Sequence, residues 1–349
     1  ERLVLSISAE TGVSIEAENT LIIFDEVQEV PKALTSLKYF HENAPQYAIV
    51  AAESLLGVAL HQGTSFPVGK VDFLDLYPLN FREFLCAMGE KQFVSMLDSC
   101  DTQMVTVFKT KYIERLREYY FVGGMPEVVK DFSEKKDYNR VRAIQKNLIN
   151  YYQQDFSKHA EIKLVPRLNL VWNSIPMQLA KENKKYIYGQ VREGSRAKDF
   201  ELAIQWLLDC GLIHKVQRIQ KPDLPLKAYI DFDAFKLFLV DIGLLIAMTD
   251  LDAKVIIEGN KIFTEFKGAL TEQYILQQLI SDVGVIPYYY STQNSKGEID
   301  FLVQGKTSVI PIEVKAEENL KAKSLKAFCE KYQPSYAVRT SMSDYREQD

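Results

Sequence analysis

The sequence has few of the residues that build disulfide frameworks, metal clusters or membrane spans. Four histidines are scattered singly along the chain, which argues against a histidine and cysteine metal site. Four cysteines are equally far apart and form no C-x-x-C pair, so we interpret them as reduced thiols and predict a cytoplasmic protein: Cys86, Cys100, Cys210 and Cys329. The longest apolar runs, such as "FLVDIGLLIAM" at 238–248, contain an acid and are too short for a membrane span, so no membrane partner is predicted.

The chain also lacks a strong net charge. Its formal charge is −5 and its pI is about 5.6, so no overall field attracts it to nucleic acid or to an anionic surface. With 349 residues, 47% hydrophobic and 26% charged, the composition is that of a globular protein with room for two or three domains.

The first informative stretch is "LIIFDEVQEVPK" at 21–32, where four apolar residues lead directly into Asp25 and Glu26. Nucleotide hydrolases present their magnesium-holding carboxylates in this way, at the end of a buried strand. "TLIIFDE" and "YAIVAAES" have the length and composition of central strands of a parallel sheet, buried on both faces. "KVDFLDLY" is a third candidate strand, and "PLNFREFLCAM" predicts a helix after it.

A phosphate-binding glycine loop is missing. The stretch "GTSFPVGKV" at 63–71 has five residues between its glycines and Val71 where a magnesium-binding hydroxyl is required, so it does not fit G-x-x-x-x-G-K-[ST]. We therefore expect the first strand, its glycine loop and the following helix to lie upstream of residue 1. Without that loop, Asp25 and Glu26 are expected to hold little nucleotide.

Six motifs occur in an order that resembles the bacterial and archaeal AAA-type ATPases with a C-terminal domain of unknown function. They are "IIFDEVQEVP", "SLLGVAL", "GTSFPVGKVDFLDLYPLNFREF", "YFVGGMPEVV", "FKLFLVDIGLL" and "GEIDFLVQGKTSVIPIEVKAEEN". The resemblance extends over nearly the whole chain and implies ATP and Mg²⁺ as cofactors.

The resemblance also implies roles for individual residues. Asp25 would hold Mg²⁺ through water, and Glu26 would polarise the attacking water. Further roles are a γ-phosphate sensor, a phosphate-directed cation and an adenine-covering turn, carried respectively by Ser54, by Lys70, and by Gly124 with Pro126. Glu53 departs from the family pattern, which usually has glycine at this position, and a carboxylate beside bound phosphate would be repulsive. A surface lysine and an ordinary helix stop remain open as alternatives for Lys70 and the glycine-proline turn.

The middle of the chain predicts a winged helix. "RAKDFELAIQWLLDCGLIHKV" gives an amphipathic helix that ends at Gly211 and continues into a strand, and "PLKAYIDF" would be the returning strand of the wing. Such a unit could contact phosphate, or it could pack on the nucleotide domain and relay its state.

A second group of acids lies in the C-terminal third. Alternation along a strand places Glu313 and Lys315 on one face, and a β-hairpin would bring Asp300 beside them. Two carboxylates can chelate Mg²⁺ while the lysine assists catalysis, and Glu272 in the preceding helix could complete the site. This order resembles the PD-(D/E)XK nuclease fold. A surface ion pair or a non-catalytic module with the same fold remains an alternative.

These observations predict a multidomain α/β protein with three parts. They are a partial P-loop NTPase parallel sheet with a helical lid at 1–160, a winged-helix domain at 161–250, and a restriction-endonuclease-like α/β domain at 251–349. We expect an ATPase-family protein whose nucleotide state is relayed through the winged helix to the nuclease-like domain. The alternatives are a Mg²⁺-dependent nuclease of DNA or RNA regulated by the ATPase part, and a non-catalytic assembly protein. Formation of a homo-oligomer is left open.

Overall fold

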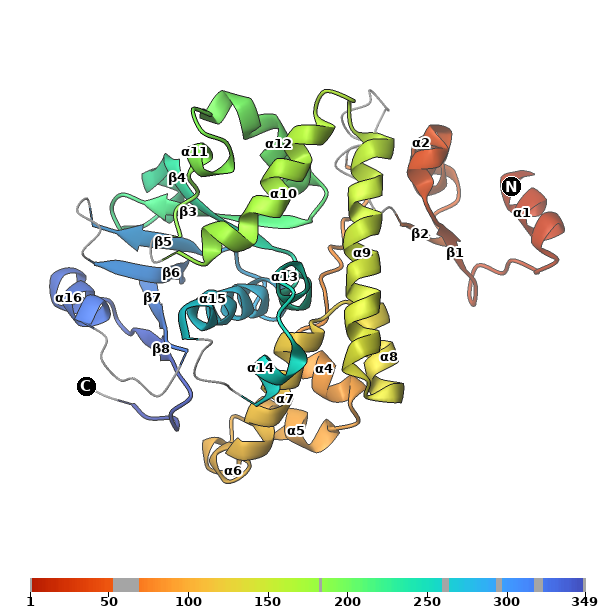
Figure 1. Cartoon of the computed structure of the whole chain (residues 1–349). Helices are drawn as coiled ribbons and strands as arrows, with labels where there is room; N and C mark the ends of the chain where they lie inside the picture. The colour runs from red at the N-terminus through yellow and green to blue at the C-terminus, as the bar shows by residue number, and fades with distance from the viewer. Residues whose placement is uncertain are drawn as a thin grey trace. The chain divides into compact units, whose positions relative to one another are not determined.

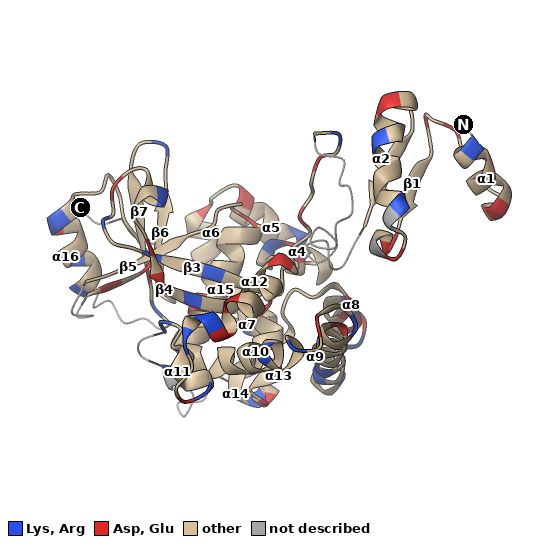
Figure 2. Cartoon of the chain, turned by 90° about the horizontal axis from the view of Figure 1, so that it is seen from above, with Lys and Arg blue, Asp and Glu red and all other residues tan. Residues whose placement is uncertain are grey.

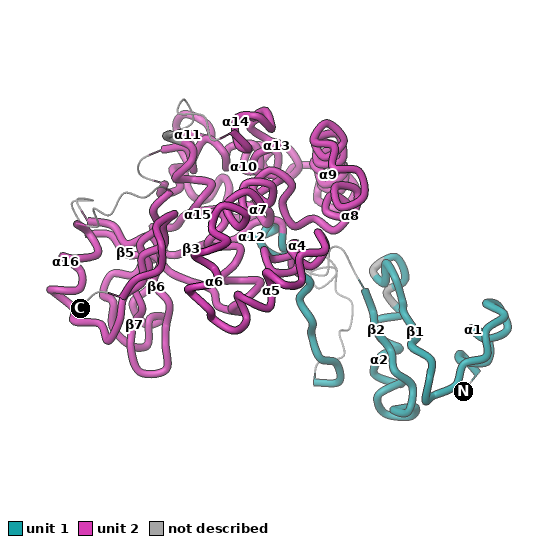
Figure 3. Tube along the Cα trace, turned by 90° about the horizontal axis from the view of Figure 1, so that it is seen from below, with its two compact units in different colours: residues 1–76, 205–211 teal, residues 77–204, 212–349 magenta. Residues whose placement is uncertain are grey.

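A computed structural model (Figure 1) describes residues 2–52, 69–181, 184–258, 264–292, 297–316 and 323–347. The chain divides into two compact units (Figure 3). Unit 1 comprises Glu1–Leu76 and Gln205–Gly211, and unit 2 comprises Tyr77–Ile204 and Leu212–Asp349. The finer domain boundaries at 160 and 250 stay predictions. Among the described residues, none of the helices has the length and apolar character needed to cross a membrane.

Unit 1 contains a small parallel sheet, in agreement with the two strands predicted there. Its elements are α1 (Arg2–Thr11), β1 (Leu21–Phe24), η1 (Val27–Glu29), α2 (Pro31–Asn43) and β2 (Ala48–Ala51). Strands β1 and β2 pair in parallel from Leu21 with Ala48 to Phe24 with Ala51. One face packs on a small core that contains Val4, Phe40 and Ala44. On β1 and β2, the alternate side chains are exposed, in contrast to the predicted burial of both faces: Leu21, Ile23 and Val50.

The predicted third strand is wrong. Residues 71–80 have neither helix nor strand, and Phe73, Leu74 and Leu76 are exposed. An apolar run forms a strand only where a neighbouring strand accepts its backbone hydrogen bonds, and among the described residues β1 and β2 pair only with each other. The helix predicted after it is confirmed as α4 (Phe81–Ala87), where Asn80 and Glu83 form a reciprocal capping box.

The first half of unit 2 is helical, as predicted. After α4 come α5 (Lys91–Asp98), α6 (Thr102–Val107), α7 (Lys109–Val122), α8 (Pro126–Lys135) and α9 (Tyr138–His159). The helices α13 (Ile242–Met248) and α14 (Ala253–Ile257) pack against α7, and α13 also packs against α9. Aromatic side chains such as Phe84, Tyr119 and Phe121 are completely buried in this layer, which gives it a large apolar core.

The second half of unit 2 is built on one mixed sheet. Its helices are α10 (Val165–Leu179), α11 (Tyr188–Val191), α12 (Ala197–Asp209, shared with unit 1), α15 (Thr264–Ser281) and α16 (Lys323–Tyr332), with η2 at Leu226–Tyr229. Its strands are β3 (Ile213–Ile219), β4 (Ile230–Leu239), β5 (Tyr288–Ser291), β6 (Glu298–Gln304), β7 (Val309–Val314) and β8 (Val338–Thr340), and their order in the sheet is β4-β3-β5-β6-β7-β8.

The sheet joins two parts that the sequence assigns to different domains. The β3–β4 hairpin corresponds to the predicted wing, β5 to β7 correspond to the strands predicted for the nuclease-like part, and β8 extends the same sheet. Gly211 has a φ of 68° after α12, which explains the stop there, since glycine adopts this region without strain. The returning strand begins at Ile230, later than predicted, because 226–229 form a 3₁₀ turn. The winged-helix assignment itself stays a prediction.

Candidate active site

Asp25 and Glu26 follow β1 at the carboxyl end of the parallel sheet in unit 1. Both are exposed, and Asp25 Oδ1 accepts a hydrogen bond of 3.0 Å from the backbone N–H of Glu26. Glu26 has a φ of 48°, in the left-handed region that non-glycine residues rarely occupy. Strained backbone of this kind is often kept at functional positions, and here it occurs in an exposed acid pair at the end of β1.

The other residues predicted to bind nucleotide are less informative. Ser54 lies outside the described residues. Lys70 Nζ lies 3.6 Å from Glu42 Oε1, and both side chains are partly exposed. This agrees with the surface lysine that the sequence left open, and the direction of Lys70 toward phosphate stays a prediction.

Gly124 belongs to a tightly packed turn in the interior of unit 2. A Cβ at Gly124 would overlap the backbone carbonyl of Leu79, and one at Gly123 would overlap the carboxyl group of Asp241. Pro126 begins α8 just after the turn, at an exposed position. Close packing alone therefore explains the two glycines, and an adenine contact by Gly124 and Pro126 stays a prediction.

Asp241 holds this turn together and was not recognised in the sequence. It caps α13 by accepting from Leu244 N–H at 3.0 Å, and its Oδ2 accepts from Gly124 N–H at 2.7 Å and from Gln277 Nε2 at 3.2 Å. Complete burial raises the pKa of its carboxyl group, an effect that these donors oppose. The sequence signal was an acid inside the apolar run "FLVDIGLL", because an acid in a buried segment requires hydrogen-bond donors.

The second predicted group of acids is brought together in unit 2. Strands β6 and β7 form an antiparallel hairpin, and Asp300 Oδ2 accepts a hydrogen bond of 2.7 Å from Val314 N–H. Lys315 Nζ lies 2.6 Å from Glu313 Oε1, as expected for residues on one face. Glu272 of α15 lies close enough to Asp300 for the charges of the two carboxyl groups to interact. The hairpin and the helix thus place all four predicted residues in one neighbourhood.

Burial makes this neighbourhood electrostatically unusual. Desolvation raises the pKa of Asp300 to about 8, and the nearby charges of Glu272 and Glu313 add to the effect while Lys236 opposes it. Desolvation also acts on Glu272, but Lys184 and Lys236 outweigh it and lower the pKa of that carboxyl group. Asp300 therefore favours its protonated form near neutral pH.

Two lysines that neutralise this group were also missed in the sequence. Lys236 of β4 is completely buried, with Nζ 2.5 Å from Glu298 Oε1, 3.6 Å from Glu272 Oε2 and 4.9 Å from the centre of the Tyr289 ring. Burial opposes the charged form of Lys236, but Glu272, Glu298 and Asp300 together raise the pKa of its ammonium group. Lys184, before α11, donates to Glu272 Oε1 in a very short contact.

In Figure 2, ribbon positions of basic and acidic residues lie next to each other near β4, β5 and β6. The lysine inside "AFKLFL" was the usable signal, since a charge in a buried strand requires a partner.

The donor chemistry of this carboxylate cluster (Glu272, Asp300 and Glu313) fits Mg²⁺, which prefers carboxylate oxygens. Glu272 Oε2 and Glu313 Oε2 are buried oxygens without a hydrogen-bond partner in the described part of the chain. As the side chains lie, however, no group of three or more histidine, cysteine or acidic residues within the described ranges is arranged to hold a metal ion. The lysines, rather than a cation from solution, balance the charge in this arrangement.

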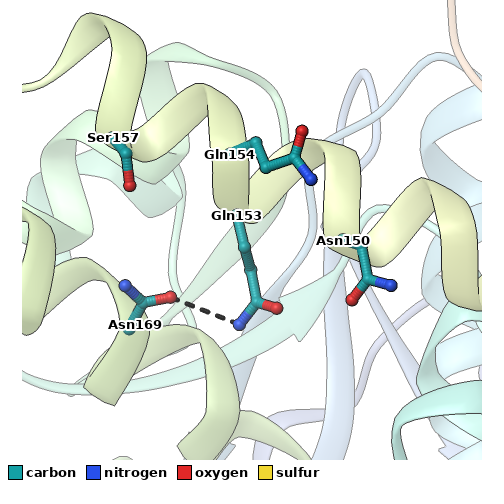
Figure 4. A pocket seen from close by; sticks show the side chains of 5 residues that line it. All are labelled: Asn150, Gln153, Gln154, Ser157 and Asn169. Atoms are coloured by element: carbon teal, nitrogen blue, oxygen red, sulfur yellow. Dashed lines mark hydrogen bonds between the residues drawn. The ribbon is translucent and has the colours of Figure 1, made fainter.

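Two hollows lie elsewhere in unit 2. An open hollow of about 460 Å³ between α9 and α10 is lined by amide and hydroxyl groups, with a 3.2 Å hydrogen bond from Gln153 to Asn169 (Figure 4). A second hollow of about 320 Å³ is lined in part by Arg167, Arg192 and Asp199. Of the residues that the sequence predicts for the two sites, none of the nine that the structure describes lines either hollow.

Comparison with protein families divides the chain into three matches. Residues 2–85 match an AAA domain, which supports an AAA-type ATPase family and an ATPase-type function for this part, with the nucleotide binding and Mg²⁺ use that such a domain implies. Residues 113–255 match a domain of unknown function (DUF8612), and residues 267–349 match another (DUF4143). No curated protein and no solved structure matches the chain.

Proposed function

We propose that this chain couples an AAA-type nucleotide domain to a metal-dependent, nuclease-like site in unit 2. Asp25 and Glu26 would serve Mg²⁺ and the attacking water on the nucleotide side, as their place at the end of a parallel strand favours. Asp300 and Glu313, completed by Glu272, would hold a second Mg²⁺ that supplies Lewis-acid activation of a phosphodiester. Lys315 would stabilise negative charge on the phosphate, a role that suits an ammonium group beside a metal-binding carboxylate.

One observation carries the proposal. Glu272 interacts with charged residues of both predicted parts. Its ion-pair partners Lys184 and Lys236 come from the segment predicted as the winged helix. Asp300, whose carboxyl group its charge affects, comes from the nuclease-like strands. A change in the position of the middle segment therefore alters the charge balance at the nuclease-like site directly. The strands of both segments also belong to one sheet, which gives such a change a mechanical path.

The test is a cleavage assay with Mg²⁺ or Mn²⁺ and labelled single-stranded and double-stranded DNA and RNA. We expect metal-dependent cleavage that falls at least about 100-fold in Glu313→Gln and Lys315→Gln, since each removes a group required in the transition state. Glu330→Gln and Lys326→Gln are matched controls, because these exposed residues of α16 carry the same charges at a surface ion pair. Absence of cleavage with every substrate and metal, or cleavage that survives both site variants, would refute the nuclease assignment.

A second candidate is a non-catalytic binding module. The pairing of the carboxylate cluster with lysines favours it, since buried ion networks of this kind also occur as purely structural features. Such a module would cleave nothing, and Glu313→Gln would change the stability of the protein but not its metal content.

A further inference from the structure

Glu272 is held by two ammonium groups that differ in how firmly they are fixed. Lys236 lies in the middle of β4, is completely buried, and contacts Glu298 and the Tyr289 ring as well as Glu272. Lys184 lies outside any helix or strand, before α11, and its side chain keeps 14% of its exposure. Within the described residues, Glu272 is the acid with which Lys184 forms an ion pair. Lys236 is thus part of the core, whereas Lys184 reaches the cluster from its edge.

The carboxylate cluster also carries unsatisfied acceptors that point to a cation. Glu272 and Glu313 are each only 4% exposed, yet one oxygen of each has no hydrogen-bond partner in the described part of the chain. Lys236 Nζ contacts both Glu272 and Glu298, the first residue of β6. The N–H of Val314, next to Glu313, donates to Asp300 two residues further along β6, so both carboxylates lie beside the same strand. Buried acceptors of this kind are normally satisfied by a donor, a water molecule or an ion.

We propose that Lys184 is an internal counter-ion that occupies the cation position of this cluster and leaves it when a divalent cation binds. The inference rests on the metal site in the proposed function and adds its regulation. A divalent cation and the ammonium group of Lys184 cannot both lie against Glu272, because like charges at that distance repel strongly. The metal affinity of the site is then set by the position of Lys184.

The experiment is a calorimetric titration of the protein with Mn²⁺ alone, without nucleic acid or nucleotide. Lys184→Gln keeps a hydrogen-bond donor for Glu272 but removes the charge, so it should bind Mn²⁺ at least about tenfold more tightly than wild type. Lys184→Arg keeps the charge and should bind like wild type. Lys181→Gln makes the same change three residues earlier and should also leave the affinity unchanged.

The outcomes separate this inference from the metal site itself. Tighter binding in Lys184→Gln that disappears in the double variant with Glu313→Gln supports the proposal. Equal affinity in wild type and Lys184→Gln, lost in Glu313→Gln, would overturn the role of Lys184 but leave the metal site intact. Absence of Mn²⁺ binding in every variant would overturn both.

A second measurement needs no substitution and is independent of whether the variants fold. In wild type, the labelling of lysine amines by an acetylating reagent is followed by mass spectrometry with and without saturating Mn²⁺. Release of Lys184 should increase its labelling rate several-fold, while Lys236 stays unlabelled because it is completely buried. Unchanged or slower labelling of Lys184 with Mn²⁺ bound would contradict the proposal.

Discussion

The negative charges of the two groups of acids in this protein are stabilised in different ways. Asp25 and Glu26 in unit 1 are exposed, so water stabilises their charges. Glu272, Asp300 and Glu313 in unit 2 are withdrawn from water, and the chain itself supplies the compensation through Lys184, Lys236 and Lys315 together with a retained proton on Asp300. The comparison teaches that burial, and not the number of acids, determines how much of the surrounding sequence a carboxylate site requires.

The sheets that carry the two groups of acids also differ in how deeply their residues are buried. Within the described residues, unit 1 has two short strands with an exposed apolar face, whereas the sheet of unit 2 has six strands and carries completely buried residues such as Phe238 and Phe301. An acid pair at the edge of the small sheet can change with little effect on folding. An acid in the large sheet is part of the core, so its substitution is expected to change stability as well as function.

The largest effect that distinguishes the two groups is expected for Lys236→Met. The substitution keeps most of the apolar stem but leaves Glu272 and Glu298 without the ammonium group between them, which should lower the free energy of unfolding by about 3–5 kcal/mol. Urea denaturation monitored by circular dichroism measures it. Lys70→Met is the matched control in unit 1, where the loss of an exposed pair should cost less than about 1 kcal/mol. Equal losses in the two variants would show that burial does not decide the outcome.

The next effect is a dependence on pH, produced by Asp300. Its carboxyl group loses its proton near the ordinary value of 3.8 in the unfolded chain but has a pKa of about 8 in the folded protein. Between these values the folded state binds the additional proton, so its contribution to stability is complete below pH 4 and is lost as the pH rises toward 8, by at most about 1.4 kcal/mol per unit.

Asp300→Asn removes this titration. Compared with wild type, the variant should gain relative stability steadily between pH 5 and 8 in urea unfolding experiments, and the difference should level off above pH 8. Asparagine still offers an oxygen to Val314 N–H, so the backbone contact is preserved. A difference that stays constant over this range would contradict the assignment of a raised pKa to Asp300.

A smaller effect tests whether the glycine-proline turn belongs to the core or to a nucleotide site. Gly124→Ala forces a Cβ against the Leu79 carbonyl and should lower the free energy of unfolding by about 1–3 kcal/mol. Gly189→Ala in α11 is the control, because its Cβ would meet nothing within 4 Å. The core interpretation would be wrong if Gly124→Ala matched the control in stability and weakened only the binding of a fluorescent ATP analogue.

Local patterns predicted much of the fold. The strands β1, β2, β6 and β7 and the helix α12 follow from periodicity and stop signals within a few residues, so the sequence contained them. The hairpin of Asp300 and Glu313 was predictable for the same reason, since strand alternation and a short connection determine which residues meet. The third strand failed because strand formation depends on a partner that composition does not reveal.

The missed residues act over long separations in the sequence. Asp241 contacts Gly124 across 117 positions, Lys184 meets Glu272 across 88, and Lys236 meets Glu298 across 62. Such pairs produce no periodic pattern in the sequence. The only available indication was the physical rule that a buried charge requires a partner. That rule identifies which residue needs a partner but not where the partner comes from. The acids of the site were therefore predictable, and their counter-ions were not.

The smallest expected effect concerns the backbone of Glu26, which belongs to the exposed acid pair of unit 1. A φ of 48° is unfavourable for glutamate but not for glycine, so Glu26→Gly should relieve strain. Glu26→Ala removes the same carboxylate but keeps the Cβ, so the difference between the two variants isolates the backbone term. We expect Glu26→Gly to be more stable than Glu26→Ala by up to about 1 kcal/mol in urea denaturation. Equal stability would mean that the left-handed geometry carries no strain. A gain would mean that the exposed site retains a residue whose backbone opposes folding, which is expected where the side chain is kept for chemistry and not for structure.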